Sequence, residues 1–144
     1  MNIAEQLPKI LIALFVLGGG AVIVSKIINP SSGSVVVDVK VPKLSEQANR
    51  GKISFDENCA QCHGENASGS DNGPPLVHNI YNPGHHSDMA FRLAAKRGVQ
   101  RHHWNFGNMP QQPQVNEKQM ESVVFYVREL QMANGIFYQE HKMQ

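Results

Sequence analysis

The sequence predicts a small all-α domain preceded by a single N-terminal transmembrane helix. The chain has 144 residues, which is enough for one domain and an appendage. Residues 10–24 carry no charge and are all apolar or glycine, as in a membrane-spanning helix. Segments 44–62 and 116–130 repeat apolar side chains at helical spacing, and 88–97 is bounded by helix start and stop signals. We therefore divide the chain into an anchor (1–28), a linker (29–43), a helical domain (44–134) and a C-terminal tail (135–144).

The composition excludes several classes of protein. The chain has 13 Lys and Arg against 12 Asp and Glu, a net charge of +1, so it lacks the basic excess typical of nucleic-acid binding. Its 41% hydrophobic content is ordinary for a folded protein and argues against disorder. Two cysteines are too few for the disulfide framework of a small secreted scaffold.

The anchor is long enough to span a bilayer if Lys26 reaches back to the head groups. Ile10–Ile28 would form about 28 Å of helix against a hydrocarbon core of about 30 Å. A cleaved signal peptide is the alternative, since Gly19 and Ala21 fit the small-x-small cleavage pattern. Apolar residues continue past Ala21 and favour the anchor. Either interpretation sends the rest of the chain across a membrane.

The segment that follows the anchor predicts an extended linker. Asn29 and Pro30 stop a helix. Val35–Val41 alternates partly with charged residues as a strand does, but no second strand is available to pair with it. If extended, residues 29–43 could reach about 50 Å.

The first helix of the domain is predicted over Leu44–Cys62. Ala48, Gly51 and Phe55 recur there at three- and four-residue spacing, which defines one helix face. A glycine inside a helix costs about 1 kcal/mol relative to alanine. Gly51 therefore indicates the close approach of another element, for which the last helix is the candidate.

The strongest motif lies at the end of this helix. Cys59, Cys62 and His63 form Cys-x-x-Cys-His, the attachment motif of c-type haem. On a helical turn two thiols lie near enough to join the two vinyl groups of one porphyrin, and imidazole becomes the proximal iron ligand. A thioredoxin-like pair would need a strand before the first cysteine. A zinc site would need a fourth donor, commonly from a second Cys or His pair at motif spacing, and the chain has no further cysteine. We therefore expect one covalently attached haem c with its iron.

Two further helices have clear boundaries. Asp88–Arg97 is predicted between the cap Ser87 and the stop Gly98. Asn116–Leu130 starts with a capping pair, Asn116 and Gln119, and Asn134 with Gly135 supplies the stop. Its apolar face consists of Met120, Val123, Val124, Val127 and Leu130, with Tyr126 beside it.

With these features the chain resembles the class I c-type cytochromes, in a membrane-anchored bacterial monohaem form. That family places a glycine eight residues and an aromatic residue four residues before the first haem cysteine, and Gly51 and Phe55 match. The resemblance implies that the terminal helices cross at this glycine, against an aromatic residue of the last helix, here Tyr126. It covers about residues 44–134.

The resemblance also implies the second ligand and a supporting bond. Gly73-Pro74 is similar to a family motif whose carbonyl accepts a hydrogen bond from the proximal histidine, which fixes the ring. Met109, in Gly107-Asn108-Met109-Pro110, resembles the distal ligand. A thioether ligand raises the reduction potential and leaves no open iron site, which indicates an electron carrier and not an enzyme. The rivals are Met89, expected in the core, Met120 and a histidine.

The histidine doublets depart from the common family pattern. His85-His86 and His102-His103 could supply a bis-histidine haem or an auxiliary metal site. We expect surface or propionate-facing rings instead, because adjacent loop residues rarely both point inward. Trp104 is expected to form a wall of the haem pocket, with its indole N–H in reach of a propionate.

A run of basic residues lies in the same part of the chain: Arg92, Lys96, Arg97 and Arg101. Such a run is usually a solvated helix face. In a haem protein it also offers counter-charges for propionates or a docking patch for an acidic redox partner.

The expected function is single-electron transfer between respiratory or photosynthetic complexes. The resemblance implies haem attachment beyond the cytoplasmic membrane, which places the domain on the periplasmic side of a bacterial inner membrane. Membrane redox complexes or other electron carriers are the expected partners. The alternatives are a haem subunit fixed in an oxidase or reductase complex, and a haem-based gas sensor or enzyme with a labile sixth ligand.

Overall fold

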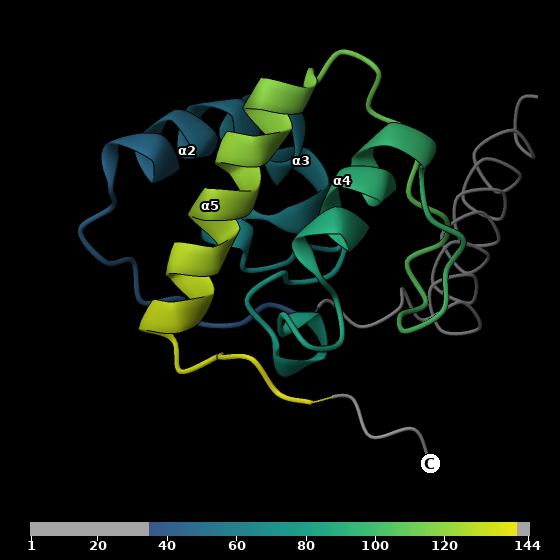
Figure 1. Cartoon of the computed structure of the whole chain (residues 1–144). Coiled ribbons are helices and arrows are strands. Elements are labelled where there is room, and N and C mark those ends of the chain that lie inside the picture. Colours follow the sequence, from purple (N-terminus) through teal and green to yellow (C-terminus); the bar gives the residue numbers. More distant parts are fainter. Residues whose placement is uncertain (1–34, 141–144) are drawn as a thin grey trace, which may run out of the picture. The chain divides into compact units, whose positions relative to one another are not determined.

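The computed structural model describes residues 35–140, and this part of the chain is helical without β-strands. The elements are α2 (Glu46–Asn58), α3 (Ala60–His63), η1 (Glu65–Ala67), η2 (Asn79–Tyr81), α4 (Asp88–Arg97) and α5 (Glu117–Ala133) (Figure 1). Within the described range the one β-type pairing outside helices is an isolated antiparallel bridge between Val99 and Met109. The predicted all-α fold is therefore confirmed for the domain.

The predicted anchor, residues 1–28, lies outside the described residues. Between residues 35 and 140, no helix combines the length and the apolar character needed to cross a membrane.

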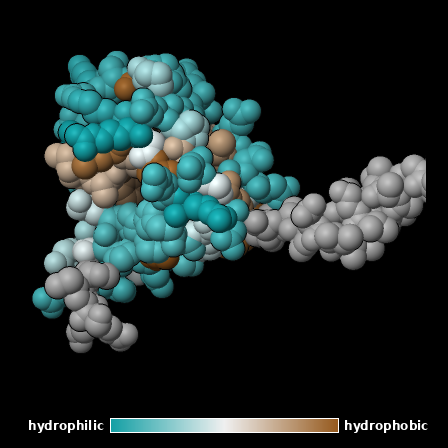
Figure 2. Space-filling model, turned by 90° about the vertical axis from the view of Figure 1, so that its right-hand side faces the viewer, coloured by the Kyte–Doolittle hydropathy of each residue, from teal (hydrophilic) through white to brown (hydrophobic). Residues whose placement is uncertain are grey.

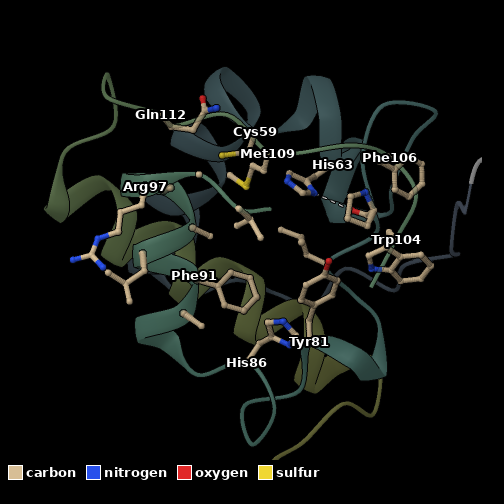
Figure 3. Close-up of a pocket in the computed structure, with 18 of the residues that line it drawn as sticks. Cys59, His63, Tyr81, His86, Phe91, Arg97, Trp104, Phe106, Met109 and Gln112 are labelled. Carbon is tan, nitrogen blue, oxygen red and sulfur yellow. Dashed lines mark hydrogen bonds between the residues drawn. The ribbon is translucent and has the colours of Figure 1, made fainter. Parts of the chain in front are cut away.

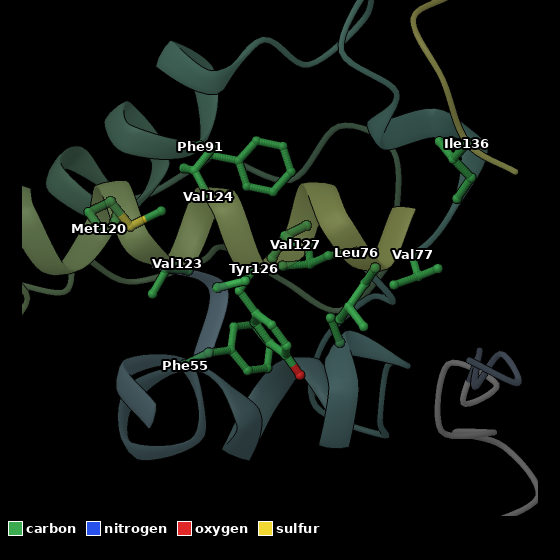
Figure 4. Close-up of a cluster of buried hydrophobic side chains, with 14 residues drawn as sticks. Phe55, Leu76, Val77, Phe91, Met120, Val123, Val124, Tyr126, Val127 and Ile136 are labelled. Carbon is green, nitrogen blue, oxygen red and sulfur yellow. The ribbon is translucent and has the colours of Figure 1, made fainter. Parts of the chain in front are cut away.

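The helices α2 and α5 cross where the sequence predicts a close approach. A Cβ atom placed on Gly51 would lie 1.9 Å from the backbone oxygen of Ser122 and 2.9 Å from the Cβ of Tyr126. Phe55 and Tyr126 are fully buried and meet edge to face, with ring centroids 5.5 Å apart (Figure 4). The Tyr126 hydroxyl donates to Asn66 Oδ1 at 3.1 Å. Both predictions for this crossing, the close approach and the tyrosine, are confirmed.

The first predicted helix is interrupted. α2 ends at Asn58, and Cys59 has φ −120° and ψ −34°, so the short helix α3 starts in a new direction at Ala60. At the other end the Ser45 side chain accepts from Ala48 N, which sets the start of α2 at Glu46 and not at residue 44. The prediction of one continuous helix over 44–62 was wrong.

The other two helices follow their capping signals. Ser87 caps α4, and Gly98 follows it with φ +74°, where glycine is favoured. The Asn116–Gln119 capping box starts α5, which continues to Ala133, three residues beyond the predicted end, before Asn134.

The linker assignment of residues 35–43 was wrong, because this segment packs on the domain. Val37 N donates to Ser68 O at 2.9 Å. The Asn134 side chain pairs with the backbone of Lys40, accepting from its N–H and donating to its C=O, each at 2.9 Å. Val39 packs partly buried against the core. The segment is extended, but the folded domain begins at or before residue 35.

The folded domain also extends beyond its predicted C-terminal end at residue 134. Ile136, assigned above to the tail, is 6% exposed and belongs to the core, and its N–H donates to Gln131 O at 2.9 Å. Met89, in contrast, was predicted to lie in the core and does not. It lies on the solvent side of α4 and is 59% exposed, so that prediction was wrong. The core, part of which is shown in Figure 4, consists of Ala48, Phe55, Ala67, Leu76, Val77, Phe91, Ala95, Met120, Val123, Val124, Tyr126, Val127, Leu130 and Ile136.

Candidate functional site

A cavity of about 440 Å³ opens beside the Cys-x-x-Cys-His segment (Figure 3). Its walls come from α2, α3, α4, α5 and the 98–109 loop, and most of them are apolar. Four predicted site residues line this cavity: Cys59, His63, Pro74 and Met109. Figure 2 shows a face of the domain on which hydrophilic residues predominate and hydrophobic ones gather in a limited area.

His63 is held in one orientation at the end of α3. The residue is 9% exposed, and its Nδ1 lies 2.8 Å from the carbonyl oxygen of Pro74. Because the carbonyl can only accept, Nδ1 carries the proton and Nε2 keeps its lone pair. Burial lowers the pKa of His63, which favours the neutral ring. This is the hydrogen bond that the resemblance implies, and it leaves one nitrogen of His63 available for a metal.

The two cysteines differ in environment. Cys59 lines the cavity and is half-buried, whereas Cys62 is exposed and is not part of the cavity wall. Burial, with a smaller contribution from Cys62, raises the pKa of the Cys59 thiol to about 11. A redox-active Cys-x-x-Cys pair needs a lowered pKa. The Cys59 thiol therefore does not have the lowered pKa of a thioredoxin-like attacking thiol.

Met109 reaches the cavity from a loop that is fixed by backbone bonds. Its N–H donates to Val99 O at 2.9 Å, and Val99 N–H donates to Met109 O at 3.0 Å. A Cβ on Gly98 would lie 2.6 Å from Met109 O, so the bridge depends on this glycine as well as on its positive φ. The two rivals are placed differently: Met89 is largely exposed and lies outside the cavity wall, and Met120 lines the cavity from α5.

The polar groups at the cavity indicate an acidic ligand. Trp104 Nε1 is buried and has no hydrogen-bond partner within the described part of the chain. The Tyr81 hydroxyl is its neighbour, but their geometry is not that of a hydrogen bond. A buried N–H without an acceptor costs about 1–3 kcal/mol, so a bound acceptor would relieve it. Arg97 and Arg101 also line the cavity. An apolar pocket with an unpaired indole and two guanidinium groups fits a flat macrocycle that carries carboxylates.

Comparison with known proteins supports the same kind of ligand. The family model described as Cytochrome c matches residues 48–131. The chain belongs to the cytochrome c family. No curated protein and no solved structure gives a significant match. Membership implies a covalently bound haem c with iron and a general role in haem-based electron transfer, and the cavity residues of this cytochrome fit that cofactor.

The histidine doublets are brought together, which the sequence analysis did not expect. We call His85, His86, His102 and His103 the histidine cluster. His85 Nε2 lies 3.2 Å from His103 Nε2, and the His102 and His103 ring centroids are 4.2 Å apart. Burial, and then the neighbouring imidazoles, lower the pKa of His103; for His86 burial again dominates.

Arg128 of α5 organises the loop that carries the first doublet. Its guanidinium donates to Tyr81 O at 2.9 Å, to His86 O at 2.5 Å and to Asp88 Oδ1 at 2.8 Å. The Gln131 side chain adds a bond to Tyr81 O at 3.1 Å. The sequence signal was weak, since Arg128 is simply one arginine in the last helix. Two of its partners are backbone oxygens, those of Tyr81 and His86, which a residue pattern does not reveal.

Proposed function

We propose that this cytochrome carries single electrons between membrane redox complexes or other electron carriers, tethered to the periplasmic side of a bacterial inner membrane. The family supports the general role of electron carrier. The apolar stretch 10–24 supports the tether, and the Cys-x-x-Cys-His motif supports a periplasmic domain. The observation that carries the proposal is the shared cavity of His63 and Met109, each fixed by hydrogen bonds of its own.

Each site residue has a distinct proposed role. Cys59 and Cys62 would form the two thioether links, His63 would bind the iron through a ring nitrogen, and Met109 would bind it through its sulfur. When bound, haem c supplies one-electron chemistry at its iron. The Pro74 carbonyl orients His63 and increases its basicity through the Nδ1–H bond.

The same set of residues favours a carrier over a sensor or an enzyme. If His63 and Met109 both bind the iron, the protein itself would supply both of these ligands and leave none of their places open for oxygen chemistry. The backbone bridge at Met109 opposes loss of the sulfur, since the loop would have to break two hydrogen bonds to withdraw it. We therefore expect the ferrous protein to bind carbon monoxide slowly. Rapid binding without denaturant would favour the sensor.

A spectrum of the oxidised protein tests the distal ligand. We expect a sulfur-to-iron charge-transfer band in the parent protein and its loss in Met109→Ala. Met89→Ala is the matched control, because Met89 is exposed and outside the cavity, and it should keep the band. If the band is lost in Met120→Leu but kept in Met109→Ala, the sulfur ligand comes from Met120 of α5, and the assignment to Met109 is contradicted.

Fractionation of a host that matures c-type cytochromes tests the tether. The full chain should be found in the membrane fraction and resist a high-salt wash. A variant in which a cleavable export signal replaces residues 1–28 should be released as a soluble coloured protein. Release of the full chain by salt would show that the N-terminal segment is not an integral anchor. After mild detergent extraction, co-migration with a large complex would favour a fixed subunit over a mobile carrier.

A further inference from the structure

The histidine cluster has the donor atoms of a metal site. One nitrogen from each of His85, His86 and His103 can be chosen so that all three lie within 4.8 Å of one another. The closest pair, His85 Nε2 and His103 Nε2, is 3.2 Å apart. Two nitrogens bound to one tetrahedral Zn²⁺ at about 2.0–2.1 Å lie about 3.3 Å apart. This pair therefore already has the spacing of two ligands of one ion.

The second nitrogen of His86 is used in the way that metal-binding histidines use it. His86 Nδ1 lies 2.7 Å from the carbonyl oxygen of Ile80, so Nδ1 donates and Nε2 keeps a lone pair. Such a bond from the non-coordinating nitrogen fixes the tautomer and the ring orientation of metal ligands. His102 has the same arrangement, with Nδ1 2.9 Å from Gln100 O, although it is not in the group of three.

The backbone beneath the first doublet is rigid. The N–H groups of His85 and His86 both donate to Asn82 O, at 3.0 and 2.9 Å. Asn82 is buried, and His86 O accepts from Arg128. Two loops that are far apart in sequence thus present their imidazoles to one point, one loop before α4 and the other after it. A site on such supports needs little rearrangement to bind an ion.

The donor set selects the class of metal. The group consists of imidazoles without a carboxylate, which suits first-row transition ions and not Mg²⁺ or Ca²⁺. Four rings this close also repel one another when protonated, whereas an ion would hold the neutral rings together. We propose that His85, His86 and His103 bind one divalent transition-metal ion, Cu²⁺ or Zn²⁺, with Cu²⁺ the tighter of the two.

The position of the proposed site connects it to the haem. His86, His102 and His103 line the cavity that also contains His63 and Met109. Figure 3 shows His86 at the end of the cavity remote from Cys59. A cation bound there would add positive charge at the cavity that would hold the haem and would favour the reduced haem, which carries one positive charge less. Metal binding is therefore expected to raise the reduction potential of the haem.

Equilibrium dialysis of the full haem-loaded chain against Zn²⁺ at pH 7.5 tests the site. We expect one equivalent to bind in the parent protein and at least a tenfold loss of affinity in a His85→Ala, His103→Ala double variant. His78→Asn is the matched control: it removes an imidazole outside the cluster and keeps an acceptor for Ile80 N. Equal binding by the parent and the double variant, or no binding by the parent, would overturn the proposal.

Two readouts separate the site from misfolding and from surface binding. Cu²⁺ added to the oxidised protein should give an electron paramagnetic resonance signal with splitting from several nitrogens, which the double variant should lack while still carrying covalently attached haem. If the alanine variant does not mature, His85→Gln with His103→Gln replaces it. Zn²⁺ should raise the haem potential of the parent and not of the variant. Stoichiometric binding without that shift would overturn the placement beside the haem.

Discussion

The crossing of α2 and α5 gives the sharpest stability prediction, because two backbones meet there. The added methyl of Gly51→Ala would lie 1.9 Å from Ser122 O, whereas ordinary contacts start at 3.4 Å, so the helices must separate by about 1.5 Å. Overpacking in a core costs about 1–3 kcal/mol, and a clash with backbone belongs at the upper end. Alanine returns about 1 kcal/mol of helix propensity. The expected net loss is about 2 kcal/mol.

Denaturant unfolding of the haem-loaded protein, followed by far-ultraviolet circular dichroism, measures this loss. For a domain of this size about 2 kcal/mol corresponds to a fall of about 8–16 °C in melting temperature. Glu57→Ala is the matched control, an exposed substitution in the same helix, and should stay within about 0.5 kcal/mol of the parent. A Gly51→Ala protein as stable as the parent would show that the helices can move apart freely and would refute the close-packed crossing.

Three further predictions concern other contacts. Gln131 is fully buried and donates to Leu76 O at 2.8 Å, so Gln131→Leu should lower the free energy of unfolding by about 1–3 kcal/mol. Gln111→Leu, at an exposed position, should leave the free energy of unfolding unchanged. If urea titrations gave the two variants equal losses, the buried hydrogen bond of Gln131 would not be the cause. Asn116→Ala should lower the free energy of unfolding by about 1 kcal/mol through loss of the α5 cap. Asn116→Ser, which also caps a helix, should restore that stability in the same titration. Burial raises the pKa of Tyr81 to about 12 and that of Tyr126 further, so the unfolded state ionises first. The melting temperature of the reduced protein should therefore fall as the pH rises above about 10, and less so in a double variant with phenylalanine at both positions.

Local signals in the sequence predicted much of the fold. Ser87, Asn116 and Gly98 mark helix boundaries because capping depends on a few neighbouring residues. Gly51 predicted a close approach because a helix tolerates glycine poorly without a reason. In contrast, the packing of residues 35–43 depends on Asn134 and Ser68, which lie far away in the chain. A segment without periodicity gives no sign of such partners.

The residues of the candidate site also differ in how far the sequence could predict them. Cys59, Cys62 and His63 form a contiguous motif, so their role could be predicted from spacing alone. Met109 could be predicted only through the family resemblance, since its bridge to Val99 is a backbone pairing that no side-chain pattern encodes. The histidine cluster was missed because it requires the loops on both sides of α4 to fold toward each other. That arrangement depends on Arg128 and Asn82, which hold the first doublet through bonds to its backbone atoms.

The Val99–Met109 bridge has a consequence for the speed of the proposed electron transfer. Electron exchange is fast when the surroundings of the redox centre change little between its two charge states, and a preorganised polar scaffold has that property. With its strand-like pairing on one side and Pro110 on the other, Met109 has few alternative backbone conformations. The proposed sulfur ligand would thus keep its place through each oxidation and reduction, and the barrier would come mainly from the solvent and the partner protein.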